Sequence, residues 1–232
     1  DHPRAFDNGI YHGFVRAGRW HTTDGRPVAP LSQNRETGVK PTDLTCVFRG
    51  EPDRVAWMCD LHVDPEGHPC ILFSVQRGGG ALRGRRDAVQ DGQDHRYHFA
   101  RWDGQGWRVH EIAHAGRRLY AGEDDYTGLG ALDPQQPNQV FISTDAHPVT
   151  GVPLVSAADG LRHWEIFRGT STAAGAAWDW TPVTHDSATD HLRPIVPVWP
   201  GAAGRQVVLW LRGSYRSYTD YDLDVVGLLP AG

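Results

Sequence analysis

The sequence has little lysine, methionine and cysteine, and it has no long apolar run. Its 232 residues include one methionine, three cysteines and a single lysine, Lys40. No apolar stretch approaches the roughly 20 residues that a membrane-spanning helix needs, and the start, Asp1–Arg4, has no signal-peptide core. Because Cys46, Cys59 and Cys70 are odd in number, a fully paired disulfide framework is excluded and one bridge stays open.

The chain also has no excess of positive charge. Its formal net charge at pH 7 is −5 and its isoelectric point is about 6.2. An acidic chain repels the phosphate backbone, so we expect no nucleic-acid partner. Hydrophobic residues make up 39% of the chain and charged residues 22%, with a mean hydropathy of −0.49. That balance is typical of a globular domain and, without an apolar run, predicts no membrane partner.

Turn-forming and aromatic residues are plentiful, with 27 glycines, 16 prolines, nine tryptophans and seven tyrosines. Short apolar or alternating runs lie between the turn residues, which predicts β-strands, and no stretch shows helical periodicity. The glycine- and arginine-rich stretch 78–94 predicts a long loop with a basic tip. The predicted strands are 10–16, 44–49, 55–63, 70–76, 96–102, 107–112, 126–132, 139–144, 163–168, 178–183, 193–199, 206–212 and 219–228.

Two stretches of the sequence repeat each other. Residues 64–74 (DPEGHPCILFS) and 133–143 (DPQQPNQVFIS) align without gaps at an offset of 69 residues, and 199–210 (WPGAAGRQVVLW) form a weaker third copy. Each copy predicts a strand, a tight turn and a second strand. A recurring unit of this size fits a four-stranded propeller blade with long loops. Three unrelated hairpins with similar turns are the alternative.

The repeat predicts an all-β fold, a β-propeller of four-stranded antiparallel blades in a single domain over 1–232. Blades would occupy 51–115, 120–185 and 189–232, and 1–50 would hold only the outer half of another. That makes about three and a half blades, whereas closed propellers have about 4–8. Open ends would leave unpaired strand edges. We therefore expect the C-terminal part of a larger propeller whose N-terminal blades precede this chain.

One turn has a recognisable pattern. Ser171, Gly175 and Trp178 stand at the spacing of the Asp-box turn, S-x-D-x-G-x-x-W, of sialidase-like propellers, with Ala173 in place of the aspartate. Its expected role is structural, because glycine permits the turn and tryptophan packs between sheets.

Three stretches together resemble a known family. They are DHRYHFARWDG (94–104), YAGEDDYTGLGALDP (120–134) and LRPIVPVW…VVLWLRGSYRSYTDYD (192–222). In combination they are similar to the BNR-repeat propeller family that includes ulvan lyases, rhamnose–glucuronate lyases and a related α-L-rhamnosidase branch. The resemblance implies a seven-bladed propeller of which this chain holds the C-terminal half. It also implies an extracellular or periplasmic protein that acts on a polysaccharide or oligosaccharide.

The activity that the resemblance implies is β-elimination on a rhamnose–uronate glycan, with no required cofactor. An α-L-rhamnosidase-type glycoside hydrolase and a glycan-binding propeller without chemistry are the alternatives. A lyase must neutralise the uronate carboxylate, remove the adjacent C5 proton and protonate the leaving oxygen. Tyrosine and histidine suit the proton transfers, and the planar fork of arginine suits a carboxylate.

The resemblance implies two catalytic residues in this chain. Tyr11, in GIYHGFVRAGRW, matches the family's tyrosine, and Arg26, fifteen residues later, matches its neutralising arginine. The family spacing is slightly longer, and the family's histidines would lie on earlier blades. The alternative for Tyr11 is a structural role as a strand aromatic that packs between sheets. The alternative for Arg26 is that it is a solvated turn residue.

Four further residues are candidate substrate contacts. Arg96 follows the long loop, and a structural ion pair with Asp94 is its alternative role. Tyr126 and Arg193 stand where inner strands begin, at the ends that surround a propeller's central channel. Arg212 lies in the last predicted hairpin. The acidic residues before Tyr126 belong either to the site or to a solvated turn.

A metal site is a further hypothesis. Asp60 and His62 share one face of a predicted strand, and Cys46 lies on a neighbouring strand. Relatives with a structural metal ion imply calcium or zinc here, with Asp60 or His62 as ligand. A buried, hydrogen-bonded histidine is the alternative. The sequence has no Walker-type loop, no G-x-S-x-G motif and no H-E-x-x-H motif.

Overall fold

The computed structural model shows an all-β chain. It describes residues 8–31, 38–78, 93–121, 123, 125–198 and 206–229. In this part of the chain the one helical element is a 3₁₀ turn, η2 (Pro41–Asp43). The strands are β1 (Ile10–Arg16), β2 (Arg19–Thr22), β3 (Pro27–Pro30), β4 (Thr45–Phe48), β5 (Arg54–Val63), β6 (Pro69–Arg77), β7 (His95–Trp102), β8 (Trp107–Gly116), β9 (Gly130–Leu132), β10 (Gln139–Thr144), β11 (Glu165–Ser171), β12 (Trp178–Pro182), β13 (Asp190–Ile195), β14 (Val208–Ser217) and β15 (Asp220–Leu228).

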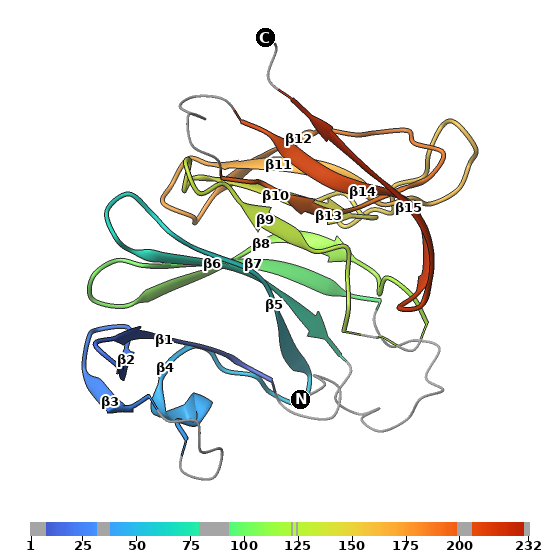
Figure 1. Cartoon of the computed structure of the whole chain (residues 1–232). Coiled ribbons are helices and arrows are strands. Elements are labelled where there is room, and N and C mark those ends of the chain that lie inside the picture. The colour runs from blue at the N-terminus through green and yellow to red at the C-terminus, as the bar shows by residue number, and fades with distance from the viewer. Residues whose placement is uncertain are drawn as a thin grey trace.

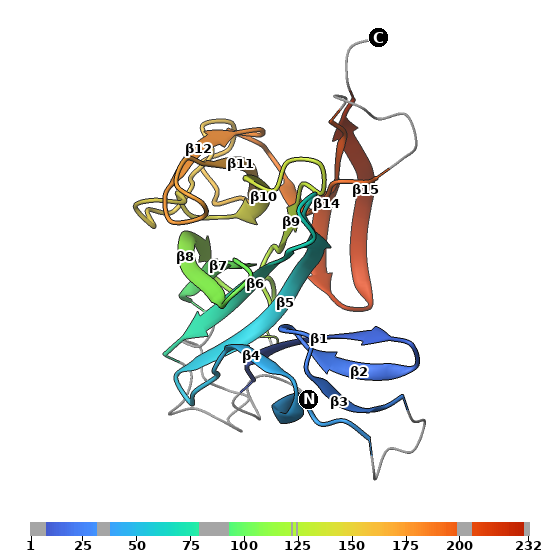
Figure 2. The same cartoon turned by 90° about the vertical axis from the view of Figure 1, so that its left-hand side faces the viewer.

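The strands form four antiparallel sheets that follow one another along the chain (Figure 1). Their strand orders are β3-β2-β1-β4, β5-β6-β7-β8, β9-β10-β11-β12 and β13-β14-β15. Figure 2 shows the sheets spread around the molecule, and β9 contacts both β5 and β13, the first strands of the neighbouring sheets. The predicted fold class, a partial β-propeller of four-stranded antiparallel blades, is confirmed.

The first sheet contains two strands that the sequence did not predict. The β1 residues Ile10–His12 pair with β4, and Gly13–Arg16 pair with β2, which continues to β3. Strands β2 and β3 have four residues each, and β3 has a proline at both ends. Such short, proline-bounded segments show too little alternation to be recognised.

The two clearest copies of the sequence repeat have the same local structure. Asp64 begins the turn between β5 and β6, and its carboxylate accepts a hydrogen bond from the backbone N–H of His68 at 2.8 Å. Asp133 begins the turn between β9 and β10, and its carboxylate accepts from the N–H of Gln135 at 2.9 Å. Part of the third copy, 199–205, and most of the predicted loop 78–94 lie outside the described residues.

The main core lies between the second and third sheets. Apolar side chains alternate along β6, β7 and β10, so that each strand places one row of them against the neighbouring sheet. Leu72 and Ile142 are fully buried there, and the closest contacts of Gly130 leave no room for a side chain. The buried members of this cluster are Cys70, Leu72, Tyr97, Phe99, Ala113, Ala115, Leu132, Val140, Ile142 and Phe167.

The glycine–tryptophan turn joins β11 to β12. Its Ser171 hydroxyl accepts a hydrogen bond from the N–H of Gly175, whose φ is +94°. Trp178 donates its indole N–H to the Gly175 carbonyl at 2.8 Å and packs edge-on against Phe99 of the second sheet, 5.4 Å between ring centroids. The turn therefore packs the third sheet against the second.

The three cysteines form no disulfide bond with one another. Cys46, Cys59 and Cys70 are all free, and burial raises the pKa of Cys59 and of Cys70 to about 12. These two thiols are therefore protonated at neutral pH. No helix among the described residues has the length and apolar character needed to cross a membrane.

Truncating the core between the second and third sheets should destabilise the fold. Leu72→Ala removes a side chain with 0% exposure, and the resulting cavity should lower the free energy of unfolding by about 2–5 kcal/mol. Urea titration measures this change. The matched control is Leu161→Ala, at a leucine that is 60% exposed, and it should change stability little. Equal losses in both variants would contradict the assigned core.

Candidate functional site

The site that stands out is built around Arg193 on β13. Arg193 has a φ of +51°, in the left-handed region that non-glycine residues rarely adopt, and the pairing of β13 with β14 shifts register between Leu192 and Ile195. The backbone N–H of Arg193 donates to the carbonyl of Gly128 at 2.9 Å. Backbone strain and bulges of this kind concentrate at functional sites, where they aim a side chain.

Aromatic rings surround the guanidinium group of Arg193. Its central carbon lies 5.2 Å from the ring centroid of Tyr126 and 5.7 Å from that of Tyr215. Tyr120 lies between these two tyrosines, with centroid distances of 6.3 and 5.6 Å, and Trp57 of β5 meets Tyr126 edge-on at 5.7 Å. We call these five residues the arginine–aromatic cluster. It joins the second, third and fourth sheets.

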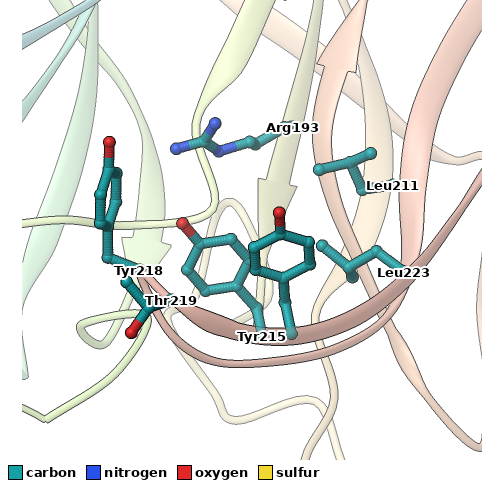
Figure 3. A pocket seen from close by; sticks show the side chains of 7 residues that line it. Arg193, Leu211, Tyr215, Tyr218, Thr219 and Leu223 are labelled. Carbon is teal, nitrogen blue, oxygen red and sulfur yellow. The ribbon is translucent and has the colours of Figure 1, made fainter.

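A cavity of about 730 Å³ opens beside this cluster. Figure 3 shows Arg193 entering it from one side, with the rings of Tyr215 and Tyr218 on the other. The Nε atom of Arg193 is buried and has no hydrogen-bond partner among the described residues. A guanidinium group with an unused donor and flanking aromatic faces suits a planar anion attached to a sugar ring, because arginine binds carboxylates through its fork and rings pack on sugars.

The loop before β9 positions Tyr126. Backbone hydrogen bonds join Leu119 to Tyr126 at 2.7 Å and Tyr126 to Glu123 at 3.2 Å, which closes a tight turn. Asp125 is 2% exposed, so the acidic run is not simply a solvated turn at this position, while Asp124 lies outside the described residues. Burial raises the pKa of the Tyr120 phenol, and the nearby Glu123 carboxylate raises it further.

The structure brings two of the four candidate substrate contacts, Tyr126 and Arg193, together. Arg96 is held in ion pairs instead, 2.5 Å from the Asp94 carboxylate and 3.0 Å from that of Glu111, which is the structural role considered for it. Arg212 lies 3.2 Å from Asp224 on β15. Because side chains alternate along a strand, Arg212 faces away from the side of β14 that carries Tyr215.

Tyr11 and Arg26 lie in the first sheet. Tyr11 pairs with Cys46 of β4, and Arg26 is exposed in the turn between β2 and β3. Arg26 and Cys46 line a shared cavity of about 500 Å³. No hydrogen bond or ion pair within the described residues joins Tyr11 to Arg26.

Asp60 and His62 do meet on one face of β5, with 3.3 Å between carboxylate oxygen and Nε2. The Asp60 carboxylate also accepts hydrogen bonds from the N–H groups of Leu132, at 2.9 Å, and Leu61, at 2.8 Å. Asp60 therefore ties β5 to β9, a structural task that needs no metal ion. Cys46 lies in the first sheet, opposite Tyr11.

A different group has metal-like spacing within the described part of the chain. Asp64, Glu66 and His68 place one ligand atom each within 4.8 Å of one another. Arg101 already neutralises this group, at 2.6 Å from Asp64 and 2.5 Å from Glu66. An internal arginine in that position fills the role that a cation would play.

The sequence pattern missed Trp57 and Tyr120 as members of the site. Trp57 lies inside a predicted strand and looks like a core residue, and Tyr120 lies between strands without a motif. The available signal was the entry position of Trp57 on an inner strand, the same criterion that selected Tyr126 and Arg193.

A histidine just before β11, His163, lies between two carboxylates, one of them at the start of β13. The Nε2 atom of His163 lies 2.9 Å from Asp159 and its Nδ1 atom 3.1 Å from Asp190. Asp190 is the first residue of β13, three positions before Arg193. His163 thus fixes the strand that carries the central arginine of the site.

Comparison with known proteins finds a likeness in structure. No family model and no curated protein matches the chain. Among solved structures, a polysaccharide lyase described as a PL25 ulvan lyase is similar over 90% of this chain, with a TM-score of 0.54 and 13% identity. A second structure of that lyase, bound to -[GlcA(1-4)Rha3S]-, has a TM-score of 0.53 and 14% identity.

These likenesses define the class by its fold: this chain shares the β-rich fold of a polysaccharide lyase. The particular proteins it is similar to are the two ulvan lyase structures, and it spans 39% of their length.

The His163 contacts predict a pH dependence of stability. Burial alone would lower the pKa of His163, but hydrogen bonds to Asp159 and Asp190 raise it above its ordinary value. A raised folded-state pKa stabilises the fold below the unfolded value of about 6.5, and this stabilisation disappears as pH rises through the folded value. His163→Gln should therefore cost more stability at about pH 5.5 than at about pH 8, as measured by urea unfolding.

The control for this prediction is His185→Gln. His185 also pairs with a carboxylate, Asp186 at 3.3 Å, but its side chain is 75% exposed. Its substitution should have a small effect at either pH, because exposed pairs contribute little. A pH-independent loss of stability in His163→Gln would show that its charge does not stabilise β13.

Proposed function

We propose that this chain is part of a propeller enzyme that cleaves a uronate-containing polysaccharide by β-elimination. The observation that carries the proposal is the arginine–aromatic cluster, in which Arg193 offers an unused buried donor beside a cavity walled by tyrosines. The likeness of the fold to an ulvan lyase that was solved with a glucuronate–rhamnose sulfate oligosaccharide supports the same class of substrate. We propose that rhamnose–uronate glycans are that class.

The cluster would act on the carboxylate of the uronate. A guanidinium group paired with both carboxylate oxygens lowers the negative charge that develops when the C5 proton leaves. The electrons of that C–H bond form the new double bond to C4, the C4–O bond breaks, and the leaving oxygen takes up a proton. Tyr215 and Tyr218, whose rings line the cavity, would pack against the sugar ring.

Tyr11 is the proposed proton-transfer residue and Arg26 a second carboxylate contact, from the resemblance to the lyases. The chain spans 39% of the ulvan lyase it resembles, so we propose that N-terminal blades of the same propeller supply the remaining catalytic groups. An extracellular or periplasmic location and a structural calcium or zinc ion also stay proposals.

A glycan-binding propeller without chemistry is the second candidate. One observation favours it: rings of the arginine–aromatic cluster contact the Arg193 guanidinium group, whereas no hydrogen bond or ion pair within the described residues joins the two candidate catalytic residues, Tyr11 and Arg26. Product analysis distinguishes these two candidates from a rhamnosidase. A lyase releases an unsaturated uronate that absorbs ultraviolet light, a hydrolase releases rhamnose, and a binding module releases neither.

Substitution in the cluster should weaken substrate use. In the full-length propeller, with ulvan as substrate and ultraviolet absorbance as readout, Arg193→Ala should lower kcat/KM by about 10²–10³-fold, because a donor to the developing charge is lost. Arg193→Lys should recover only part of this, since lysine has no planar fork. Arg168→Ala is the matched control, at an exposed arginine on β11, and it should match the wild type.

The role of Tyr11 needs its own variant. Tyr11→Phe removes only the hydroxyl group and should lower kcat by about 10²–10⁴-fold with little change in KM, as expected for a proton-transfer group. Unchanged turnover in this variant would remove Tyr11 from the mechanism. Free rhamnose without any rise in absorbance would replace the lyase by the hydrolase.

A further inference from the structure

A second cavity lies between the first and second sheets, far from Arg193. It has a volume of about 450 Å³ and is bordered by β1, by the turn after β2 and by the ends of β5 and β7. Strand β5 connects the two sites, with Trp57 in the arginine–aromatic cluster and Val63 at the second cavity. Six residues of extended strand separate them by about 20 Å. A ligand in one site therefore leaves the other site open.

One face of β1 forms a wall of this cavity. His12, Phe14 and Arg16 alternate along the strand and all three line the cavity. The guanidinium carbon of Arg16 lies 5.0 Å from the centroid of the Phe14 ring. His21 of β2 stacks on the same ring, with 5.1 Å between the ring centroids. Phe14 therefore holds the exposed Arg16 cation in place as an anion contact.

The opposite wall is aromatic and rigid. Trp102 lines the cavity and packs edge-on against Trp107, 6.0 Å between centroids. Trp107 also meets His12 edge-on at 5.3 Å and donates its indole N–H to the Thr23 hydroxyl at 3.2 Å. Thr23 in turn lies 2.9 Å from Nδ1 of His12. The rings that face the cavity are thus held in place before any ligand arrives.

Histidine nitrogens supply polar contacts in the cavity. The Nδ1 atom of His68 is buried without a hydrogen-bond partner, and the nearest carboxylate oxygen, on Asp64, is 3.9 Å away. Burial lowers the pKa of His12, so its ring is neutral at pH 7 and suits a sugar hydroxyl. Two glycines on the rim, Gly25 and Gly67, have no atom within 4 Å of where a Cβ would be, which leaves the entrance open.

We propose that this cavity is a second glycan-binding site, which takes one acidic sugar residue of a polysaccharide chain. Trp102 provides the face on which the sugar ring stacks, and His12 and His68 reach its hydroxyl groups. Arg16 pairs with its carboxylate or sulfate group. The site binds the polymer away from the arginine–aromatic cluster, and neither Tyr11 nor Arg26, the proposed catalytic residues, lines it.

Calorimetric titration of the protein with a glucuronate–rhamnose 3-sulfate tetrasaccharide tests this proposal. We expect two binding sites per chain in the wild type and one in Arg193→Ala. In the Arg193→Ala background, Val63→Trp should abolish the remaining binding, because the indole fills the cavity from a position that is 60% exposed. Leu61→Trp is the matched control, two residues earlier and 44% exposed, and it should keep the site.

A milder variant tests the charge. Arg16→Ala should weaken binding at the second site about tenfold, as for a lost charge-assisted hydrogen bond, whereas Arg19→Ala, at its exposed cross-strand neighbour, should not. The tetrasaccharide with its carboxyl groups reduced and its sulfates removed should also bind about tenfold more weakly. Equal affinity for this neutral form would overturn the acidic assignment.

Two outcomes would overturn the second site altogether. One is complete loss of binding in Arg193→Ala, and the other is equal loss in Val63→Trp and Leu61→Trp. A full-length propeller that binds the tetrasaccharide at both sites and releases no unsaturated product would refute the proposed lyase activity and leave the second site standing.

Discussion

The close approach of the inner strands is the constraint on which the rest of the structure depends. Strand β9 packs against both β5 and β13, and at Gly128 and Gly130 an added Cβ would lie within 2.4 to 2.8 Å of neighbouring atoms. Only glycine fits at this distance. Because the backbone comes so close, the Gly128 carbonyl accepts the N–H of Arg193. The same approach places Tyr126, two residues before Gly128, against the guanidinium group.

The two proposed glycan sites share one building principle. In each, a cation lies over an aromatic ring, Arg193 over Tyr126 at 5.2 Å and Arg16 over Phe14 at 5.0 Å. In each, a buried nitrogen without a hydrogen-bond partner stands at or beside the cavity, Nε of Arg193 or Nδ1 of His68. Buried polar atoms are seldom left without partners, so both positions favour a polar ligand. The second cavity lies between two sheets, whereas the first is lined by β13, β14 and β15 alone, and only the Tyr126 contact of Arg193 reaches the loop before β9.

Much of the fold was predictable because its signals are local. Alternation identified most strands to within a few residues, and repeated Asp-Pro turns identified the hairpins that begin at Asp64 and Asp133. The misses have local causes as well. Strands β2 and β3 are too short to alternate, and the predicted strand 126–132 shrinks to Gly130–Leu132 because Leu129 adopts a φ of +66°, which no periodic signal reveals.

The sequence by itself determined the all-β class, the blade-like repeat and the choice of Tyr126 and Arg193, since each rests on spacing along the chain. Only the tertiary structure decided which charged groups are free to meet a ligand. Arg96 and Asp60 look as available in the sequence as Arg193 does, yet Asp94 and Glu111 hold the first and the β9 backbone holds the second. Whether a polar side chain has a hydrogen-bond or ion-pair partner depends on residues from other strands. A linear sequence pattern does not encode that pairing.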